Sequence, residues 1–268
     1  MSQNFEFRTG SLPLLISIPH AGTAIPDDIA ESMTETARKK PDTDWFLDRL
    51  YDFFEVENAS LIAANVSRYV IDLNRSTEEQ NLYPGQNTTG LCPQTNFDGT
   101  PVYTVGNEPD DAEIKRRIEY YWRPYHKQLH SEIDRLVDKH GKAVLFDAHS
   151  IAAEIPNLFP GRLPDLNFGT NNGHSCGNAF QTLIDQFAES GKGYTQVVNG
   201  RFIGGYITRN YGDPKRNVHA LQLELSQSTY TSVGSAGENP TWNQFKADQL
   251  QELLRSLFQS IIGWVSQS

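Results

Sequence analysis

Two histidines follow apolar segments that are typical of buried strands. His20 comes after residues 14–18, and His149 comes shortly after residues 143–146. In an open parallel sheet, ligands bind beyond the carboxyl ends of the strands, so we expect both imidazoles at the same edge of one sheet. Imidazole is a good zinc ligand, and a catalytic zinc takes three protein ligands and keeps one position for water. Together the two histidines favour a metal site, although either one alone could simply end its strand.

A carboxylate interrupts the apolar segment 220–225. Glu224 occupies this position, just before Leu225 and Ser226. Burying an unpaired carboxylate is costly, so this side chain must meet a cation, a metal or the water of a cleft. Glu224 is therefore a candidate catalytic residue, and a buried structural ion pair is the alternative.

The segment 67–75 contains two arginines and an asparagine. Arg68 lies near its start, and Asn74 and Arg75 form a pair at its end. A guanidinium binds a carboxylate through two parallel hydrogen bonds, and a neighbouring amide can add a directed hydrogen bond. The segment therefore suits an anionic ligand, although by itself it could equally be surface charge.

Apolar periodicity predicts an α/β fold. The segments that predict strands are 12–18, 61–73, 143–146, 195–198 and 220–225. The segments that predict helices are 27–40, 44–55, 110–141 and 242–264, with Pro124 expected to kink or divide the third. This alternation indicates a mostly parallel or mixed central sheet flanked by helices. Because no repeat or linker composition interrupts the chain, we expect one domain over residues 1–268.

Long connections rich in glycine and asparagine separate these elements, at residues 81–106, 156–173 and 200–217. Such loops on a rigid sheet are where binding and catalytic sites are commonly built.

Composition narrows the ligand class and the compartment. The chain has 268 residues and a net charge of −10, so a nucleic-acid surface or an anionic membrane is not an expected partner. Its two cysteines fit a reducing compartment. No early segment has the pattern of a secretory signal and no apolar run is long enough to span a bilayer, so we expect a cytoplasmic protein. The sequence does not fix the oligomeric state.

These motifs resemble those of the zinc carboxypeptidase superfamily, and the segment from Arg68 to Arg75 also resembles the corresponding part of aspartoacylase. The closest resemblance is to the N-formylglutamate amidohydrolase family, and it extends over most of the chain. The matching segments are Ser17–Gly22, Thr43–Phe46, Ser67–Arg75, Asp147–Ser150, Asn167–Thr170, Gly204–Arg209 and Gln222–Ser226.

The resemblance implies a zinc-carboxypeptidase-like (phosphorylase/hydrolase-like) fold and the metal-dependent hydrolysis of N-formyl-L-glutamate, a step of histidine degradation. By this resemblance the cofactor would be one divalent ion, Zn²⁺, and the partner would be a small anionic amino-acid derivative that serves as substrate. By analogy, Glu224 would act as general base and Arg68 would stabilise the oxyanion. Asn74 and Arg75 would bind one substrate carboxylate, and Arg209 the other, with Tyr206 beside it.

The metal ligands need one adjustment to the carboxypeptidase pattern. That pattern has a glutamate three positions after the first histidine, where this chain has Thr23, a poor zinc ligand. We therefore assign the metal to His20, Asp44 and His149. Asp44 could instead cap a helix. The fallback ligands are Asp27, Asp28 and Asp48.

Other functions stay open at this point. An aspartoacylase-like deacylase of another N-acyl amino acid would use the same groups, and a non-catalytic carboxylate-binding protein would need only the arginines. His126 and His130 lie four residues apart on a predicted helix, where ordinary surface or core roles are favoured over metal binding. His174 and Cys176 could form a nucleophile and base, but a buried thiol is favoured. Asp147 shares a strand face with His149 and is expected to orient it.

Overall fold

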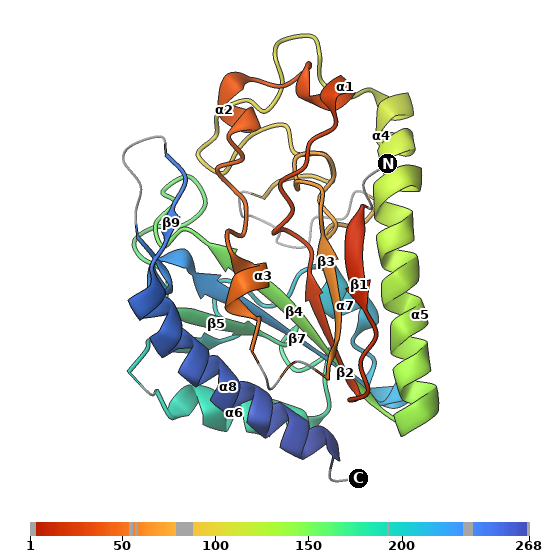
Figure 1. Ribbon diagram of the computed structural model, residues 1–268, viewed down its shortest axis with the longest axis vertical. Coiled ribbons are helices and arrows are strands. Elements are labelled where there is room, and N and C mark those ends of the chain that lie inside the picture. The colour runs from red at the N-terminus through yellow and green to blue at the C-terminus, as the bar shows by residue number, and fades with distance from the viewer. Residues whose placement is uncertain are drawn as a thin grey trace.

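The computed structural model describes residues 4–53, 56, 58–78, 88–191, 193–232 and 238–266. A seven-stranded mixed sheet runs through this part of the chain (Figure 1), with the strand order β1-β3-β2-β4-β7-β5-β6. The strands are β1(Phe5–Arg8), β2(Leu14–Ile18), β3(Ser60–Ala64), β4(Ala143–Ile151), β5(Leu166–Gly169), β6(Gln196–Val198) and β7(Val218–Ser226). A separate hairpin pairs β8(Thr231–Ser232) with β9(Thr241–Trp242).

The centre of the sheet is parallel. The four strands β3, β2, β4 and β7 run in one direction, whereas β1 pairs antiparallel with β3 and β5 pairs antiparallel with β7. Strand β6 then runs parallel to β5. The carboxyl ends of the four central strands therefore meet at one edge, where loops can gather functional groups.

Helices cover both faces of the sheet. The helices are α1(Asp27–Ala30), α2(Glu35–Arg38), α3(Leu47–Leu50), α4(Asp111–Arg117), α5(Arg123–His140), α6(Asn178–Glu189), α7(Tyr206–Tyr211) and α8(Gln244–Ser266), with a π-helical segment η2(Ile118–Trp122) and short 3₁₀ turns η3(Pro214–Arg216) and η4(Gln227–Thr229). The side chains of α3, α6 and α8 pack with one apolar cluster of the sheet, and those of α5 and α7 pack with another. Figure 1 shows α6 and α8 side by side and α5 running along the β1 side.

The central strands supply both clusters because successive side chains point to opposite faces. Leu14 and Phe146 pack with α8, whereas Leu15 and Leu145 pack with α5. Every residue of β4 and β7 is buried, as expected for central strands covered on both faces. Polar residues on these two strands must therefore find partners inside the protein.

The predicted mixed sheet is confirmed, and four of the five predicted strands correspond to β2, β4, β6 and β7. The prediction of a strand over 61–73 is wrong beyond Ala64. The chain there forms turns whose backbone hydrogen bonds go to other loops, such as Asp72 N to Leu91 O at 2.7 Å. Val70 and Leu73 are buried under α5 rather than in the sheet, and an apolar run alone does not distinguish these arrangements. Strands β1, β5 and β8 and helices α6 and α7 lie outside the segments predicted above.

The predicted helices over 27–40 and 44–55 are far shorter in the structure. Thr34 ends the first pattern, because its hydroxyl accepts a hydrogen bond from Ala37 N and starts α2 anew. The second forms one turn, α3, with Phe46 at its N-cap in the left-handed conformation; Glu55 lies outside the described residues.

The long predicted helix divides as expected near Pro124. The backbone changes to π-helical hydrogen bonding over Ile118–Trp122 before α5 begins at Arg123. Proline lacks the amide proton that an uninterrupted α-helix would need at this position. The predicted C-terminal helix is confirmed as α8.

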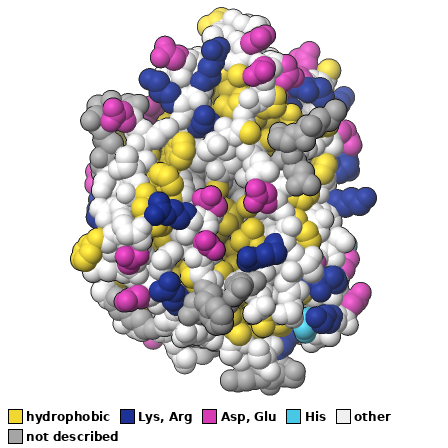
Figure 2. All heavy atoms as spheres, viewed as in Figure 1, with side chains coloured by type: hydrophobic (Ala, Val, Ile, Leu, Met, Phe, Trp, Pro, Cys, Tyr) yellow, Lys and Arg dark blue, Asp and Glu magenta, His cyan; other side chains and the backbone are white. Residues whose placement is uncertain are grey.

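Acidic and basic side chains are interspersed over the face seen in Figure 2. This pattern fits the net charge of −10 without a basic surface for nucleic acid on this face. Over the described residues, no helix is both long enough and apolar enough to cross a membrane.

Phe258 of α8 allows a test of the packing. Its ring is fully buried, with its centroid 4.7 Å from that of Phe146 and 5.7 Å from that of Phe53. We expect Phe258→Ala to lower the free energy of unfolding by about 3–5 kcal/mol through lost burial and a residual cavity. Phe245, on the same helix and 72% exposed, is the control, and Phe245→Ala should cost under about 0.5 kcal/mol. Urea unfolding measures both, and equal losses would contradict the packing described.

Candidate active site

Two adjacent strands place an imidazole beside a carboxylate. In the parallel pair of β4 and β7, His149 is directly opposite Glu224, and Asp147 is opposite Gln222. All four side chains lie on the same face of the sheet as Leu145. This face is therefore apolar near Leu145 and becomes polar toward the carboxyl edge of the sheet. Asp147 and His149 therefore share a face, as the sequence predicted.

His20 and Asp44 join this edge from two loops. His20 follows β2 after Pro19, and its carbonyl accepts a hydrogen bond from Asp44 N at 3.1 Å. The Asp44 carboxylate accepts a hydrogen bond from Ser150 N at 3.0 Å. Asp44 is not the cap of α3, whose N-cap is Phe46. The cap alternative for this aspartate is therefore excluded.

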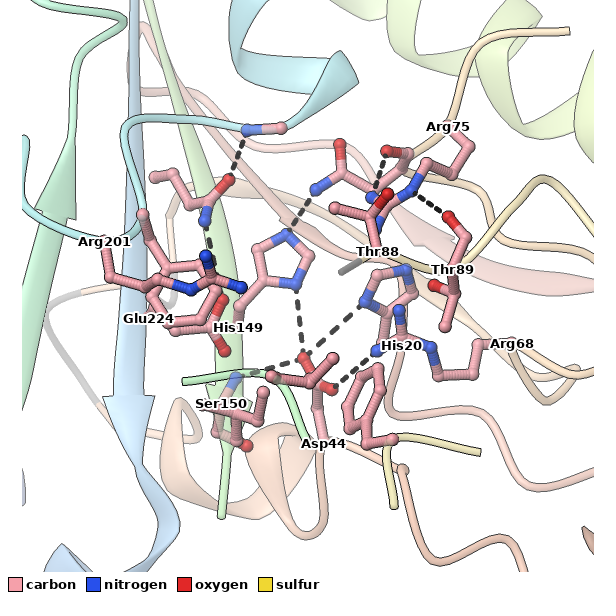
Figure 3. Close-up of a pocket in the computed structure, with 17 residues that line it drawn as sticks. His20, Asp44, Arg68, Arg75, Thr88, Thr89, His149, Ser150, Arg201 and Glu224 are labelled. Atoms are coloured by element: carbon pink, nitrogen blue, oxygen red, sulfur yellow. Dashed lines mark hydrogen bonds and ion pairs between the residues drawn. The ribbon is translucent and has the colours of Figure 1, made fainter. Parts of the chain in front are cut away.

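The side chains of His20, Asp44 and His149 converge (Figure 3), and all three are buried. Their ligand atoms lie within 4.8 Å of one another. Asp44 Oδ2 lies 3.2 Å from His149 Nδ1 and 3.9 Å from His20 Nδ1. Ligands bound tetrahedrally to zinc stand about 3.4 Å apart, so small adjustments suffice for this set to hold a divalent ion.

The outer nitrogens of both imidazoles are held by carboxylates. His20 Nε2 lies 2.7 Å from Asp72 Oδ1, and His149 Nε2 lies 3.1 Å from Asp147 Oδ2. Both Nδ1 atoms are thereby directed toward Asp44. Carboxylates behind the imidazoles are the usual way in which metal-binding histidines are oriented. This arrangement fits a metal better than it fits two histidines that merely end strands.

Negative charge predominates around these imidazoles. Burial alone would lower the pKa of His149, but Asp147 and Asp44 raise it well above its usual value. Burial raises the pKa of Glu224 to about 8, although His149 opposes this shift. Burial and the nearby Arg68 lower the pKa of His20. An environment that retains protons on His149 and Glu224 is also one that favours a bound cation.

Arg68 is the buried cation beside this cluster. Its guanidinium donates to Asp72 Oδ2 at 2.7 Å and lies 3.9 Å from Asp44 Oδ1. Although burial alone would raise it, His20 and Arg68 hold the pKa of Asp72 well below its usual range. Asp72 therefore joins Arg68 to His20 and fixes both.

Further arginines line the pocket that contains these groups. The lining includes Arg75 and Arg201 in addition to Arg68 and Glu224. Figure 3 shows Arg201 extending beside Glu224, with Arg75 at the opposite end. Arg209, which was predicted to bind a substrate carboxylate, is not among the described lining residues, and its Nε donates to Gly204 O at 2.7 Å.

Tyr206 also lies outside the described lining. Its ring packs against Trp122 and His126, with centroids 5.8 and 5.5 Å away. The predicted substrate contacts of Arg209 and Tyr206 thus have no counterpart in the lining described.

Asn74 lines the pocket and is held at both ends of its amide. Its Oδ1 accepts a hydrogen bond from Ile207 N at 2.7 Å, and its Nδ2 lies 2.9 Å from His149 Nε2. A Cβ atom on Gly205 would collide with this amide. Glycine at position 205 therefore lets the start of α7 approach Asn74, and Asn74 in turn positions His149.

Two side chains of the helical layer fix the backbone on either side of Asn74. His126 Nε2 donates to Leu73 O at 2.8 Å, and Trp122 Nε1 donates to Arg75 O at 2.9 Å. The two rings stack with centroids 3.7 Å apart. Trp122 ends the π-helical segment, and such segments are frequent near functional sites.

Sequence reasoning missed several of these residues. Asp72 and Gln222 fall inside the matching motifs but were given no role. Gln222 accepts a hydrogen bond from Gly205 N at 2.6 Å and lies within 3.5 Å of Glu224 Oε2. Arg201 lies outside the matching motifs and was given no role, whereas Arg209 lies inside the motif Gly204–Arg209.

The remaining candidates have ordinary roles. The side chains of the fallback ligands are exposed on α1 and α3; these are Asp27, Asp28 and Asp48. His126 is buried, whereas His130 is exposed and pairs with Asp134, so they do not face one site. His174 is exposed, and burial raises the pKa of the Cys176 thiol to about 11, which opposes a nucleophilic role.

A buried acid beside a candidate metal cluster, at the carboxyl edge of a mixed sheet, is an arrangement that suits the class of hydrolytic enzymes with an α/β fold. The family model described as N-formylglutamate amidohydrolase matches residues 12–231. The chain therefore belongs to the N-formylglutamate amidohydrolase family.

Two curated relatives, both named N-formylglutamate deformylase, are similar over nearly their whole length. The protein from Pseudomonas putida is 47% identical, with 98% of this chain and 97% of the relative covered. The protein from Pseudomonas aeruginosa is 44% identical, with 98% of each covered.

Two solved structures share the fold. The crystal structure of N-formylglutamate amidohydrolase from Ralstonia eutropha matches with a TM-score of 0.81 and 24% identity, covering 98% of each chain. A structure from Agrobacterium tumefaciens matches with a TM-score of 0.71 and 17% identity, covering 99% of this chain and 97% of the other. At these identities the similarity concerns the fold alone.

His126 gives a pH-dependent prediction. Burial lowers its pKa to about 4, from an ordinary value near 6.5 in the unfolded chain. The unfolded state therefore binds the extra proton between these values, so the contribution of His126 to stability is complete above about pH 6.5 and is lost toward about pH 4. We expect His126→Gln to destabilise the metal-free protein by about 2 kcal/mol less at about pH 5 than at about pH 7.

Urea unfolding at both pH values measures this difference. His130→Gln, at an exposed position on the same helix, is the control and should show little difference between the two. A pH-independent effect of His126→Gln would contradict a neutral, buried His126.

Proposed function

We propose that this protein hydrolyses N-formyl-L-glutamate to formate and L-glutamate, with one divalent metal ion, Zn²⁺, held by His20, Asp44 and His149. The observation that carries the proposal is the convergence of these three buried side chains beside Glu224 in an arginine-lined pocket. The names of the two Pseudomonas relatives support the same substrate.

The donor set suits zinc. Two neutral imidazoles and one carboxylate are a common catalytic zinc set, which leaves a position for water. Bound there, the ion would lower the pKa of water and polarise the formyl oxygen. Other first-row divalent ions suit similar nitrogen and oxygen donors, so zinc is the choice that metal analysis tests.

Glu224 would carry the proton. Its carboxylate accepts a proton from the attacking water as the new carbon–oxygen bond forms. It then delivers that proton to the amide nitrogen as the carbon–nitrogen bond breaks. A pKa raised to about 8 brings Glu224 close to neutral pH, where one group can both accept and return a proton. Gln222 lies close enough to orient it.

Arg68 would stabilise the developing oxyanion. Its guanidinium is buried and already oriented by Asp72, so little reorganisation is needed when negative charge appears on the formyl oxygen. The ion pair with Asp72 also keeps this cation in place before substrate binds.

The two carboxylates of the substrate would bind at Arg75 and Arg201. Both line the pocket with Glu224, and a guanidinium can bind each carboxylate through two hydrogen bonds. The side-chain amide of Asn74 is already hydrogen-bonded to Ile207 N and lies against His149 Nε2. Asn74 would therefore position these two groups and would not bind the substrate directly. We assign the second carboxylate to Arg201 in place of Arg209 because Arg201 lines the pocket.

Family membership and the sequence also bear on the domain organisation and the pathway of this protein. We propose that residues 1–268 form one catalytic domain that acts in histidine degradation. A cytoplasmic location and the lack of a nucleic-acid or membrane partner stay predictions from composition.

Metal removal and formate release test the proposal. We expect purified protein to contain about one equivalent of zinc and to release formate from N-formyl-L-glutamate. Chelation should abolish formate release, and added zinc should restore it. Without the ion, the three ligand side chains do not lower the pKa of the attacking water. Full activity after verified metal removal would contradict the proposal. Binding of N-formyl-L-glutamate without turnover in the zinc-loaded protein would instead favour a carboxylate-binding protein.

Replacement of the proposed base separates chemistry from metal binding. Glu224→Gln keeps the shape of the side chain but removes the proton acceptor, so kcat should fall about 10²–10⁴-fold. Zinc content should stay near one equivalent, because Glu224 is outside the three-ligand set. Glu252→Gln, an exposed change on α8, is the matched control and should retain activity. Unchanged turnover in Glu224→Gln would remove Glu224 from the mechanism.

A further inference from the structure

The active-site pocket adjoins a larger hollow through a shared wall. The inner pocket offers about 70 Å³ to water-sized molecules, and the outer hollow offers about 670 Å³. Among the described lining residues, three are common to both spaces: Phe97, Ser150 and Ile151. Ser150 and Ile151 end β4, the strand that carries His149, so Phe97 is the part of this wall that comes from a loop.

Phe97 is held firmly in this wall. Its backbone N donates to Asp42 Oδ2 at 2.8 Å, and its carbonyl accepts a hydrogen bond from Asn157 Nδ2 at 3.1 Å. The turn that follows contains Gly99, at φ 91°, and is closed by a hydrogen bond from Gly99 N to Asn96 O. The backbone that carries the ring is therefore held on both sides of Phe97.

The ring lies beside the reacting centre. The Arg68 guanidinium carbon is 4.6 Å from the centroid of the Phe97 ring. Phe97 also packs against a small apolar cluster that includes Ile151 and Ile155. The wall thus has one side toward the proposed oxyanion site and one side toward the outer hollow.

The arrangement of charges gives the substrate a direction. In Figure 3, Arg75 lies at one end of the pocket and Ser150 at the other, with the imidazoles between them. With its carboxylates at Arg75 and Arg201, the glutamate part of the substrate would place its amide nitrogen near the imidazoles. The substituent of the acyl carbon would then face the wall of Phe97, Ser150 and Ile151.

We propose that Phe97 determines acyl-group size, because its ring closes the acyl side of the pocket so that the hydrogen of a formyl group fits and a methyl or longer substituent does not. This inference rests on the proposed deformylase function and deepens it. The groups that perform the chemistry would serve any N-acyl amino acid, so the choice of acyl group must come from the shape of the wall. Shortening Phe97 would join the pocket to the outer hollow, which has room for a longer acyl chain.

The test compares N-formyl-, N-acetyl- and N-succinyl-L-glutamate with the zinc-loaded protein. We expect the wild type to favour the formyl substrate strongly, and Phe97→Ala to raise the acetyl-to-formyl ratio of kcat/KM by about 10-fold or more, the size typical of steric discrimination by one methyl group. Because Arg68 acts on every acyl group, a disturbance of Arg68 lowers all rates and cancels in this ratio. Phe97→Leu should give an intermediate ratio.

Phe202→Ala is the matched control. Phe202 is an aromatic residue that lines the inner pocket but is not among the described residues of the outer hollow. Its loss should leave the acetyl-to-formyl ratio within about twofold of the wild type, since the shared wall stays closed. A ratio that rises equally in both variants would assign acyl selection to pocket volume in general and overturn the role of Phe97.

The affinity for N-acetyl-L-glutamate, measured without hydrolysis, tests whether Phe97 excludes the acetyl group. N-acetyl-L-glutamate should bind more tightly to Phe97→Ala than to the wild type by calorimetry, with Glu224→Gln as the background that prevents hydrolysis. The inference is overturned if a folded Phe97→Ala or Phe97→Leu protein has the wild-type acetyl-to-formyl ratio of kcat/KM and the wild-type affinity for N-acetyl-L-glutamate. In that case, formyl turnover by the wild type would still support the proposed function. A wild type that releases no formate overturns the proposed function itself, and equal turnover of formyl and acetyl substrates removes the selection attributed to Phe97.

Discussion

The structure depends on a concentration of buried negative charge. Four carboxylates, Asp44, Asp72, Asp147 and Glu224, lie within the protein around two imidazoles and one guanidinium. Unpaired, such charges would cost several kcal/mol each, so every one must be compensated. Arg68 and the two histidines compensate part of this charge, and a divalent cation among His20, Asp44 and His149 would compensate more. The same excess that makes the site costly to fold would favour the binding of a cation.

Rigid elements hold the groups that must be placed accurately. His149 and Glu224 come from the two central strands β4 and β7, which are buried along their whole length. The loop residues are fixed by hydrogen bonds to these strands, as when Asp44 accepts from Ser150 N. A site supported in this way keeps its geometry without substrate, which is what electrostatic stabilisation of a transition state requires.

A second layer of residues gives the site its shape. Trp122 and His126 support the backbone around Asn74 from the junction between η2 and α5. Phe97 closes the opposite side from a separate loop. None of these side chains needs to react: Trp122 and His126 fix the backbone around Asn74, and Phe97 lines the pocket. Since the proposed reacting groups would suit many amides, residues that shape the pocket are the natural place for specificity.

The sequence by itself determined the mixed α/β sheet, the strand-end histidines and the carboxylate at Glu224, because burial patterns and turn residues are local properties of the chain. It also favoured a small anionic ligand through the arginines of the segment 67–75, which by themselves could equally be surface charge. Only the tertiary structure decided that Asp72 holds His20, that Arg201 rather than Arg209 lines the pocket, and that residues 65–73 form turns. These outcomes depend on contacts between segments far apart in sequence, and no local pattern encodes which of several equivalent side chains will reach a common centre.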